Sequence, residues 1–240
     1  GDREELTLPA SQVALIRSVC AANKNTVVVV VAGSAVVMSE WSQLPGAILQ
    51  TAYSGMEGGN ALAALLLGDV SPSGKLPFSV AHDASHYPFF DKDADDIEYD
   101  LLHGYALMDA RDIAPQFSFG HGLSYAAFAY RALCARAGHG RLSVSVSIRN
   151  DGSVVAEEVA QLYIAPPGLV VQRASKSLRG FQRVSLRPGE TRTLHFEVAC
   201  DDLNYWCEHS QSWQFEHGRY RVMMGGSSRA AEELSVDIVL

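Results

Sequence analysis

Long apolar runs and positive charge are scarce in this 240-residue sequence. Its longest apolar run, TVVVVVA from Thr26, is far below the roughly 20 residues that a membrane-spanning helix needs, so no transmembrane helix is predicted. Lys and Arg total 19 against 27 Asp and Glu, a formal net charge of −8, and no basic cluster stands out. Neither nucleic acid nor a membrane is therefore an expected partner. The charged opening GDREELTLP also lacks the apolar core of a signal peptide.

Cysteine is scarce as well, with four residues and no CxxC pair. None of them has a histidine at ligand spacing, so neither a zinc site nor a dithiol redox centre is predicted. Buried free thiols are expected at Cys20, Cys134, Cys200 and Cys207. A disulfide between Cys200 and Cys207 is the alternative in an oxidising compartment. No metal and no organic cofactor is expected.

Familiar catalytic and nucleotide-binding motifs are missing. The sequence contains neither GxSxG nor HExxH, and its eight histidines are scattered. The glycine-rich stretch SGMEGGNALAALLLGDVSPSGKLPFSV fits neither the phosphate loop GxxxxGK[ST] nor the dinucleotide fingerprint GxGxxG. Gly55, Gly58 and Gly59 are predicted to start a helix and to permit close backbone packing. For Glu57 we predict a cap or a structural hydrogen bond, with substrate contact as the alternative, because a helix N-terminus favours the ionised carboxylate.

The first half of the sequence alternates helical and strand patterns. Apolar residues at helical spacing predict a helix over residues 9–22, and the run TVVVVVA is typical of a strand covered on both faces by helices. Strands at 47–53 and 76–80 and a helix at 60–67 are also predicted. This order predicts a mostly parallel α/β sheet, although it opens on a helix and contains only about three strands. We therefore expect Gly1 to lie partway through a domain whose earlier strands belong to another segment of the polypeptide.

The second half changes to a period of two. Residues 82–114 are polar and irregular and are predicted to form a long solvated connection. In RLSVSVSIRN, apolar side chains then alternate with Ser and Arg, which is the pattern of a half-buried strand. Turn signals separate further strand candidates at 155–164, 177–186, 191–199, 212–216, 220–224 and 234–239. About seven short strands with regular turns predict a β-sandwich of the immunoglobulin or fibronectin type III kind.

Aromatic residues mark two further features. The segment PQFSFGHGLSY is predicted to dock the two halves, with aromatic side chains that pack and glycines that turn the chain, namely Phe117, Phe119, Tyr125, Gly120 and Gly122. His103 and His121 lie among such residues and are predicted to be packed or surface histidines. Trp206 and Trp213 are expected in the sandwich core. A stacking platform for sugars, formed by these two residues with Tyr205, is the alternative.

The order of motifs along the whole chain is recognisable. GDREELTLP is followed by NTVVVVVAGSAVVMSEW, YSGMEGGNALAALLLGDVSPSGKLPFSV, PQFSFGHGLSYAAFAY, NDGSVVAEEVAQLYIAPP, KSLRGFQRVSLRPGETRTLHFEV, LNYW and HGRYRVMMGGSSR. With these segments the chain resembles the C-terminal half of family 3 glycoside hydrolases of the β-glucosidase type. The resemblance implies part of an α/β sandwich domain with its linker over residues 1–114 and a fibronectin type III-like domain over residues 115–240. It also implies a preceding (β/α)8-type barrel, with the active site between the barrel and the α/β sandwich domain.

The resemblance implies hydrolysis of β-glycosides with retention, by an aspartate nucleophile and a glutamate acid/base. Two carboxyl groups about 5–5.5 Å apart carry such chemistry. The family pattern puts the nucleophile in the barrel and the glutamate in an S-G-E-G-like loop just upstream of GDREEL, so no catalytic residue is expected in this chain. Asp2 and Arg3 match the family's G-D-R segment and are the candidate substrate-binding residues; an ion pair or a helix-entry hydrogen bond is the other interpretation. The sequence departs from many relatives at Leu102 and His103, where those relatives have a glutamate.

The resulting prediction is the C-terminal portion of a β-glucosidase-like enzyme that removes terminal β-linked sugars from oligosaccharides or glycosides. Its expected partners are a β-glucoside or related oligosaccharide and the N-terminal barrel segment of the same enzyme. The 240 residues alone are expected to be inactive because they lack the carboxylate pair. A free-standing carbohydrate-binding or structural module is the alternative.

Overall fold

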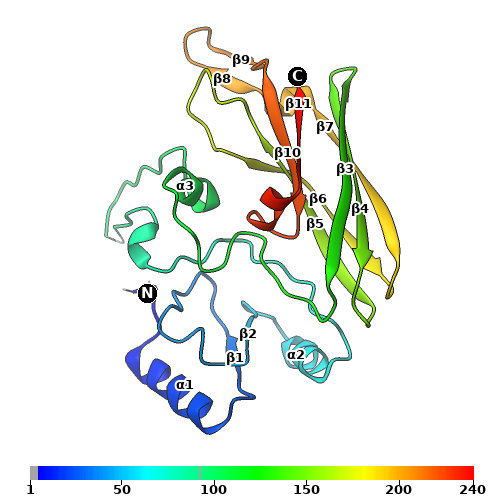
Figure 1. Cartoon of the computed structure of the whole chain (residues 1–240). Helices are drawn as coiled ribbons and strands as arrows, with labels where there is room; N and C mark the ends of the chain where they lie inside the picture. The colour runs from blue at the N-terminus through cyan, green and yellow to red at the C-terminus, as the bar shows by residue number, and fades with distance from the viewer. Residues whose placement is uncertain (1–4, 92) are drawn as a thin grey trace.

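The computed structural model describes residues 5–91 and 93–240 and contains an α/β part followed by a β-sandwich (Figure 1). The α/β part comprises α1 (Ala10–Ala22), β1 (Val27–Val30), β2 (Ala47–Gln50), α2 (Gly58–Leu67), the 3₁₀ helix η1 (Ala84–His86) and α3 (Gly104–Ala110). β1 and β2 pair in parallel, with Val27 opposite Ala47. Both predicted helices and the parallel pairing are confirmed.

Valine side chains and one tryptophan build the core of the α/β part. α1 turns Val13 toward Val30 at the end of β1, and Val36, Met38 and Trp41 complete the buried cluster. Trp41 is only 1% exposed. The run of β-branched residues in β1 suits a strand whose side chains pack on a helix, so this core follows from the sequence pattern.

Residues 76–80 do not form the predicted third strand of this sheet. The N–H of Leu76 donates to the carbonyl of His121 at 2.8 Å, and the N–H of Val80 donates to that of Phe117 at 2.7 Å. The segment therefore runs antiparallel to residues 115–125, which we call the joint, and only Val80 and Phe117 form a β-bridge. Pro77 has no N–H to donate, which weakens any continuous strand here. Within the described residues, β1 and β2 alone make up the sheet of the α/β part.

The connection over residues 82–114 is only partly as predicted. Its acidic residues Asp93, Asp95 and Asp96 are exposed, in keeping with a solvated loop. The hydroxyl of Tyr87, however, donates to the carbonyl of Ser79 at 3.0 Å, and α3 buries Leu107 and Met108. The prediction of an irregular connection is therefore wrong for α3, because Tyr105 of this helix packs against Tyr163 and Met223 of the β-sandwich.

The β-sandwich packs a four-stranded sheet on a three-stranded sheet. Its strands are β3 (Phe128–Gly138), β4 (Arg141–Asn150), β5 (Ala156–Ala165), β6 (Ser177–Leu186), β7 (Thr191–Ala199), β10 (Arg219–Gly225) and β11 (Ser235–Val239). One sheet has the order β11-β10-β5-β6 and the other β3-β4-β7, with antiparallel neighbours throughout. The predicted fold class is confirmed: a partial α/β sandwich domain followed by an all-β fibronectin type III-like sandwich.

The alternation in β4 appears directly in the sandwich core. Its apolar side chains are at most 2% exposed, namely Leu142, Val144, Val146 and Ile148. They pack between the sheets against residues of β5, β6, β7 and β10. Two short 3₁₀ helices, η2 (Cys200–Leu203) and η3 (Ala230–Glu233), close the connections around this core.

Two elements of the sandwich region differ from the predictions. β3 was not predicted, because a bulge between Arg131 and Cys134, with Ala132 at φ +53°, interrupts its alternation. Trp206 and Trp213 are not in the core. They lie on a separate hairpin of β8 (Tyr205–Cys207) and β9 (Ser212–Gln214), which pairs only with itself. Their side chains are 44% and 66% exposed because this hairpin stands outside both sheets.

All four cysteines are free thiols, which confirms that part of the prediction. Burial was predicted correctly only for Cys20; Cys134 is exposed, and Cys200 and Cys207 are partly buried. In the part of the chain that the structure describes, no three His, Cys, Asp or Glu side chains are grouped so that they could hold a metal ion. None of the helices there has the length and hydropathy needed to cross a bilayer.

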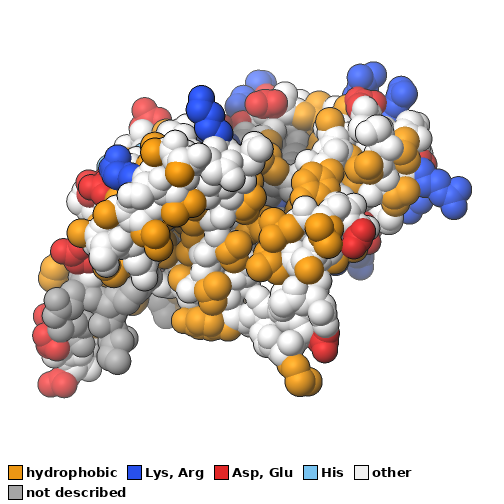
Figure 2. Space-filling model, turned by 90° about the horizontal axis from the view of Figure 1, so that it is seen from below, with side chains coloured by type: hydrophobic (Ala, Val, Ile, Leu, Met, Phe, Trp, Pro, Cys, Tyr) orange, Lys and Arg blue, Asp and Glu red, His pale blue; other side chains and the backbone are white. Residues whose placement is uncertain are grey.

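The α/β part exposes many apolar side chains. Leu15 and Val19 on α1 are 63% and 43% exposed, and the same part exposes Tyr53, Met56 and Phe89 at 78%, 96% and 88%. Hydrophobic side chains gather across the underside of the molecule (Figure 2). Single exposed apolar residues are ordinary, but grouped ones are typical of surfaces that another protein segment covers.

Candidate functional site

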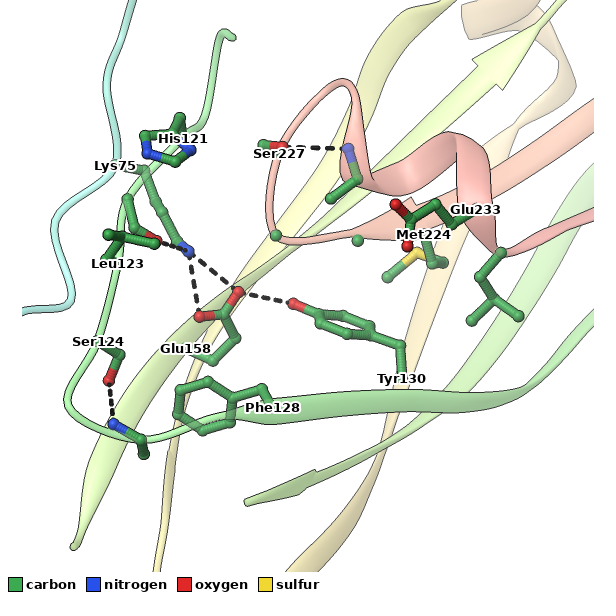
Figure 3. Close-up of a pocket in the computed structure, with 16 residues that line it drawn as sticks. Lys75, His121, Leu123, Ser124, Phe128, Tyr130, Glu158, Met224, Ser227 and Glu233 are labelled. Carbon is green, nitrogen blue, oxygen red and sulfur yellow. Dashed lines mark hydrogen bonds and ion pairs between the residues drawn. The ribbon is translucent and has the colours of Figure 1, made fainter. Parts of the chain in front are cut away.

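A cavity of about 520 Å³ lies where the α/β part meets the β-sandwich (Figure 3). Side chains from three segments that are far apart in the sequence converge in it. Lys75 comes from the stretch after α2, Tyr130 from β3 and Glu158 from β5. His121 of the joint and the backbone of residues 225–227 line the same cavity.

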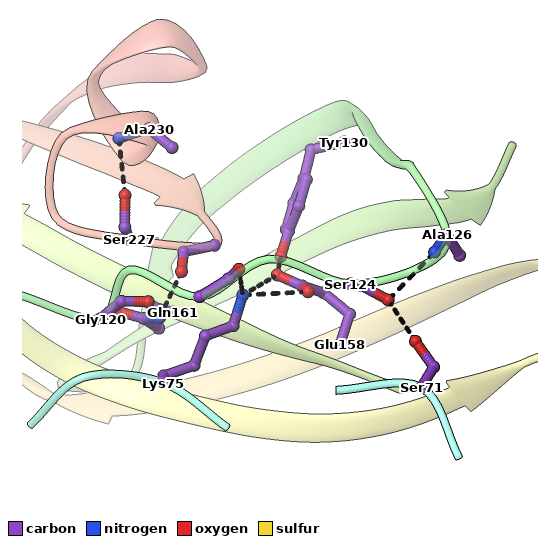
Figure 4. A network of polar contacts seen from close by, with 12 residues as sticks. Ser71, Lys75, Gly120, Ser124, Ala126, Tyr130, Glu158, Gln161, Ser227 and Ala230 are labelled. Carbon is purple, nitrogen blue, oxygen red and sulfur yellow. Dashed lines mark hydrogen bonds and ion pairs between the residues drawn. The ribbon is translucent and has the colours of Figure 1, made fainter. Parts of the chain in front are cut away.

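Lys75 and Glu158 form a largely buried ion pair in this cavity, with side chains that are 13% and 6% exposed. The Lys75 Nζ donates to Oε1 and Oε2 of Glu158 at 3.1 Å each and to the carbonyl of Gly122 at 3.1 Å. The Tyr130 hydroxyl donates to Glu158 Oε1 at 2.8 Å (Figure 4). Burial raises the pKa of the Tyr130 phenol, and the Glu158 charge raises it further, so Tyr130 stays a neutral donor.

This network is suited to joining the two parts of the fold. Each of the three Nζ–H donors of Lys75 has an acceptor, and the Glu158 carboxylate already accepts three hydrogen bonds. A carboxylate that acts as a nucleophile or a proton donor must instead be free to reach a substrate. Glu158 is therefore a structural carboxylate.

The joint is fastened to both parts of the fold. Gln161 Nε2 donates to the carbonyls of Gly120 and Gly226 at 3.2 and 2.6 Å. Gly120 has φ +78°, so it turns the chain as predicted. Gly122 serves a different purpose, because a Cβ added there would lie 2.2 Å from the carbonyl oxygen of Gly74. The two segments can therefore approach closely only because residue 122 has no side chain.

A second ion-pair cluster fastens α3 to the sandwich. Lys176, which is 4% exposed, donates to Asp109 Oδ2 at 2.6 Å and to Glu232 Oε1 at 2.5 Å. The hydroxyl of Tyr105 accepts a hydrogen bond from the N–H of Leu178 at 3.1 Å. The connection between the two parts is thus held at two places by ion pairs around a buried lysine, Lys75 and Lys176.

Both histidines singled out in the sequence behave as predicted. His103 is an exposed residue that precedes α3 and makes no side-chain cap hydrogen bond. The His121 ring packs 5.4 Å from the ring of Phe117. Burial lowers the pKa of His121, and the positive charge of Lys75 lowers it further, so the folded protein favours the neutral imidazole.

Acid should weaken this packing. The unfolded chain protonates His121 near its ordinary pKa of about 6.5, whereas the folded protein resists protonation because its pKa is lowered. Stability should therefore fall as the pH drops below about 6.5. We expect His121→Gln to lose less of its urea midpoint than the native protein between about pH 7.5 and about pH 5.5. Equal losses in the two proteins would contradict the assignment.

The remaining candidate residues from the sequence are Glu57, Asp2 and Arg3. Glu57 precedes α2 without capping it, and its Oε2 accepts a hydrogen bond from Asn60 Nδ2 at 2.6 Å. The structural hydrogen bond predicted for Glu57 is thus confirmed. Asp2 and Arg3 lie outside the residues that the structure describes.

Comparison with known proteins assigns the family. Residues 1–125, more than half of the chain, match the model of the glycosyl hydrolase family 3 C-terminal domain. The chain belongs to glycoside hydrolase family 3. Residues 158–228 match the fibronectin type III-like domain, which agrees with the sandwich described above. This family 3 chain therefore corresponds to the C-terminal part of the family's proteins.

Individual relatives agree with the family assignment. A probable β-glucosidase L of Aspergillus fumigatus is 36% identical over 97% of this chain. The solved structure of a β-D-glucoside glucohydrolase from Trichoderma reesei matches 100% of the chain with 32% identity and a TM-score of 0.93. A family 3 β-glucosidase from Bifidobacterium adolescentis matches with 35% identity and a TM-score of 0.92. The chain spans only about a third of the length of these proteins, 35%, 37% and 36% respectively.

Sequence reasoning missed the residues that join the two parts. Lys75, Tyr130 and Glu158 were not singled out, although Lys75 lies in the quoted glycine-rich stretch. Lys75 and Glu158 are separated by 83 positions, and neither stands in a local pattern that signals burial. The two glutamates that open the largely apolar run EEVAQLYIA were the one available signal, since a charge on a buried strand needs a partner.

Proposed function

We propose that this chain is the C-terminal portion of a retaining β-glycosidase, similar to β-glucosidases, that hydrolyses terminal β-linked sugars from oligosaccharides or glycosides. The observation that carries the proposal is the match of the whole chain to a β-D-glucoside glucohydrolase, with a TM-score of 0.93 at 32% identity. Residues 1–114 would supply part of the α/β sandwich domain with its linker, and residues 115–240 the fibronectin type III-like domain.

The proposed chemistry uses two carboxyl groups that lie outside the described residues. One attacks the anomeric carbon and the other protonates the leaving oxygen, at a separation of about 5–5.5 Å. In this proposal a barrel segment of the same enzyme carries the nucleophile, and the acid/base glutamate precedes GDREEL. Asp2 and Arg3 are proposed to lie near the mouth of that active site and to contact the substrate.

The exposed apolar surface of the α/β part supports a partner within the same polypeptide. A two-stranded parallel sheet is rarely stable by itself, because strands of this kind are normally covered and paired on both sides. Leu15 and Val19 are exposed on a helix that already packs on the core through Val13 and Ile16. We propose that the preceding strands and the barrel cover this surface.

The test compares two polypeptides with the aryl glycoside p-nitrophenyl β-D-glucoside, and a β-xyloside and a β-galactoside serve to assign the sugar. The full-length polypeptide that carries this chain should release p-nitrophenol, and NMR should show the β-anomer of the sugar as the first product. The 240-residue chain alone should show no turnover. Turnover by the isolated chain, or none by the full-length protein on any of these substrates, would overturn the proposal.

A further inference from the structure

The hairpin of β8 and β9 presents two tryptophans on one face. Trp206 and Trp213 are directly opposite one another in the antiparallel register, so both side chains leave the same side of the hairpin. They are 44% and 66% exposed, and their rings lie 5.6 Å apart at an interplanar angle of 73°. Outward positions of a solvent-facing hairpin are normally polar, whereas here the outward residue of each three-residue strand is tryptophan.

The opposite face of the hairpin is fixed in place. The guanidinium of Arg173 lies 5.5 Å above the ring of Tyr205 and forms an ion pair with Glu216. Arg173 Nη1 also donates to the carbonyl of Leu203 at 3.1 Å, and Glu216 Oε1 accepts from the N–H of Leu169 at 2.7 Å. These contacts tie the hairpin to the loop between β5 and β6, which runs beside it (Figure 1). The two tryptophans are therefore held on a preorganised support, which lowers the entropic cost of binding a ligand.

Hydrogen-bonding side chains accompany the tryptophans. The turn of the hairpin has the sequence EHSQ, residues 208–211, and all four residues are exposed. Gln211 Nε2 donates to the carbonyl of Glu208 at 2.8 Å, and Gln214 Nε2 donates to Ser210 Oγ at 2.8 Å. The turn thus places exposed amide, hydroxyl and carboxylate groups at one end of the hairpin, whereas Gln214 lies with Tyr205 on the face opposite the tryptophans and accepts a hydrogen bond from its hydroxyl at 3.3 Å.

We propose that this hairpin binds a chain of β-linked glucose residues through Trp206 and Trp213. A β-linked pyranose ring presents an apolar face of C–H groups and a rim of hydroxyl groups. Indole faces can cover the C–H groups, while amides and hydroxyls bind the rim, the combination of apolar lining and few polar groups that suits such ligands. The choice of glucose rests on the proposed function; the aromatic site itself does not.

The test uses the full-length polypeptide and native gel electrophoresis in gels that contain barley mixed-linkage β-glucan. The native protein should migrate more slowly as the polysaccharide concentration rises. The double variant Trp206→Ala/Trp213→Ala should raise the dissociation constant at least about tenfold, which corresponds to about 1.4 kcal/mol. Phe181→Ala is the matched control, because Phe181 is an aromatic residue on β6 of the same sandwich with 68% exposure.

Each outcome has a defined meaning. Loss of retardation in the double variant, with Phe181→Ala unchanged and equal turnover of p-nitrophenyl β-D-glucoside in all three proteins, supports the glucan site. Equal retardation of the double variant and the native protein overturns it. So does a change in oligomeric state of the double variant by light scattering, since the face would then be an interface between copies. Retardation that depends on the tryptophans in a protein without hydrolytic activity would keep this site and refute only the proposed function.

Discussion

Replacing Glu158 by leucine should destabilise the protein by about 3–5 kcal/mol, as expected when one partner of a buried ion pair is removed. The Lys75 ammonium, only 13% exposed, would lose both carboxylate acceptors, and the Tyr130 hydroxyl would lose its acceptor as well. The measurement is the urea midpoint and slope of unfolding, followed by tryptophan fluorescence.

Two further variants make this result specific. Glu157→Leu removes the neighbouring carboxylate, which pairs with Arg183 at the surface and is 39% exposed, so its expected cost is at most about 1 kcal/mol. Lys75→Met combined with Glu158→Leu should be less destabilising than Glu158→Leu alone, because no unpaired charge remains buried. If the double variant were the less stable of the two, the ion pair would not be the source of the effect.

Trp41→Ala should cost about 3–5 kcal/mol, the range for removing a large aromatic side chain from a packed core. Trp41 is 1% exposed and contacts the cluster of Val13, Val30 and Met38 on which α1 packs. Thermal or urea unfolding, monitored by circular dichroism, would measure the loss. Trp213→Ala is the matched control: it makes the same chemical change at a site that is 66% exposed, where we expect at most about 1 kcal/mol for the loss of the cross-strand contact with Trp206. Similar losses in the two variants would contradict the burial of Trp41.

Patterns predicted the sandwich well where one strand face meets the core. In β4, alternation alone identified the buried side chains, because a period of two maps directly onto the two faces of a sheet. The sequence pattern did not predict β3, because Ala132 at φ +53° shifts the register of this strand and breaks its period of two. An apolar run is less informative: Leu76 and Val80 are covered by the joint and not by a parallel sheet.

Side-chain partners across the two parts could not be predicted in the same way. The pairing of Lys75 with Glu158 depends on how the joint folds back, which no local pattern encodes. Exposure was likewise misjudged for Trp206 and Trp213, because tryptophan favours cores on average and the sequence does not show that their hairpin lies outside both sheets. The family resemblance, carried by long motifs in a fixed order, was more informative than any single residue.

The position of the Lys75–Glu158 contact limits how this enzyme family could be recombined in the laboratory. A chimaera of two family members joined anywhere between residues 75 and 158 takes the ammonium from one parent and the carboxylate from the other. It also brings the Gly74 carbonyl of one parent against residue 122 of the other when the junction lies between them. Crossovers placed before Leu65 keep both contacts within one parent, together with the hydrogen bonds of Tyr125 to Leu65 and Ser71, so the fibronectin type III-like domain should be exchanged together with the segment from residue 65 onward.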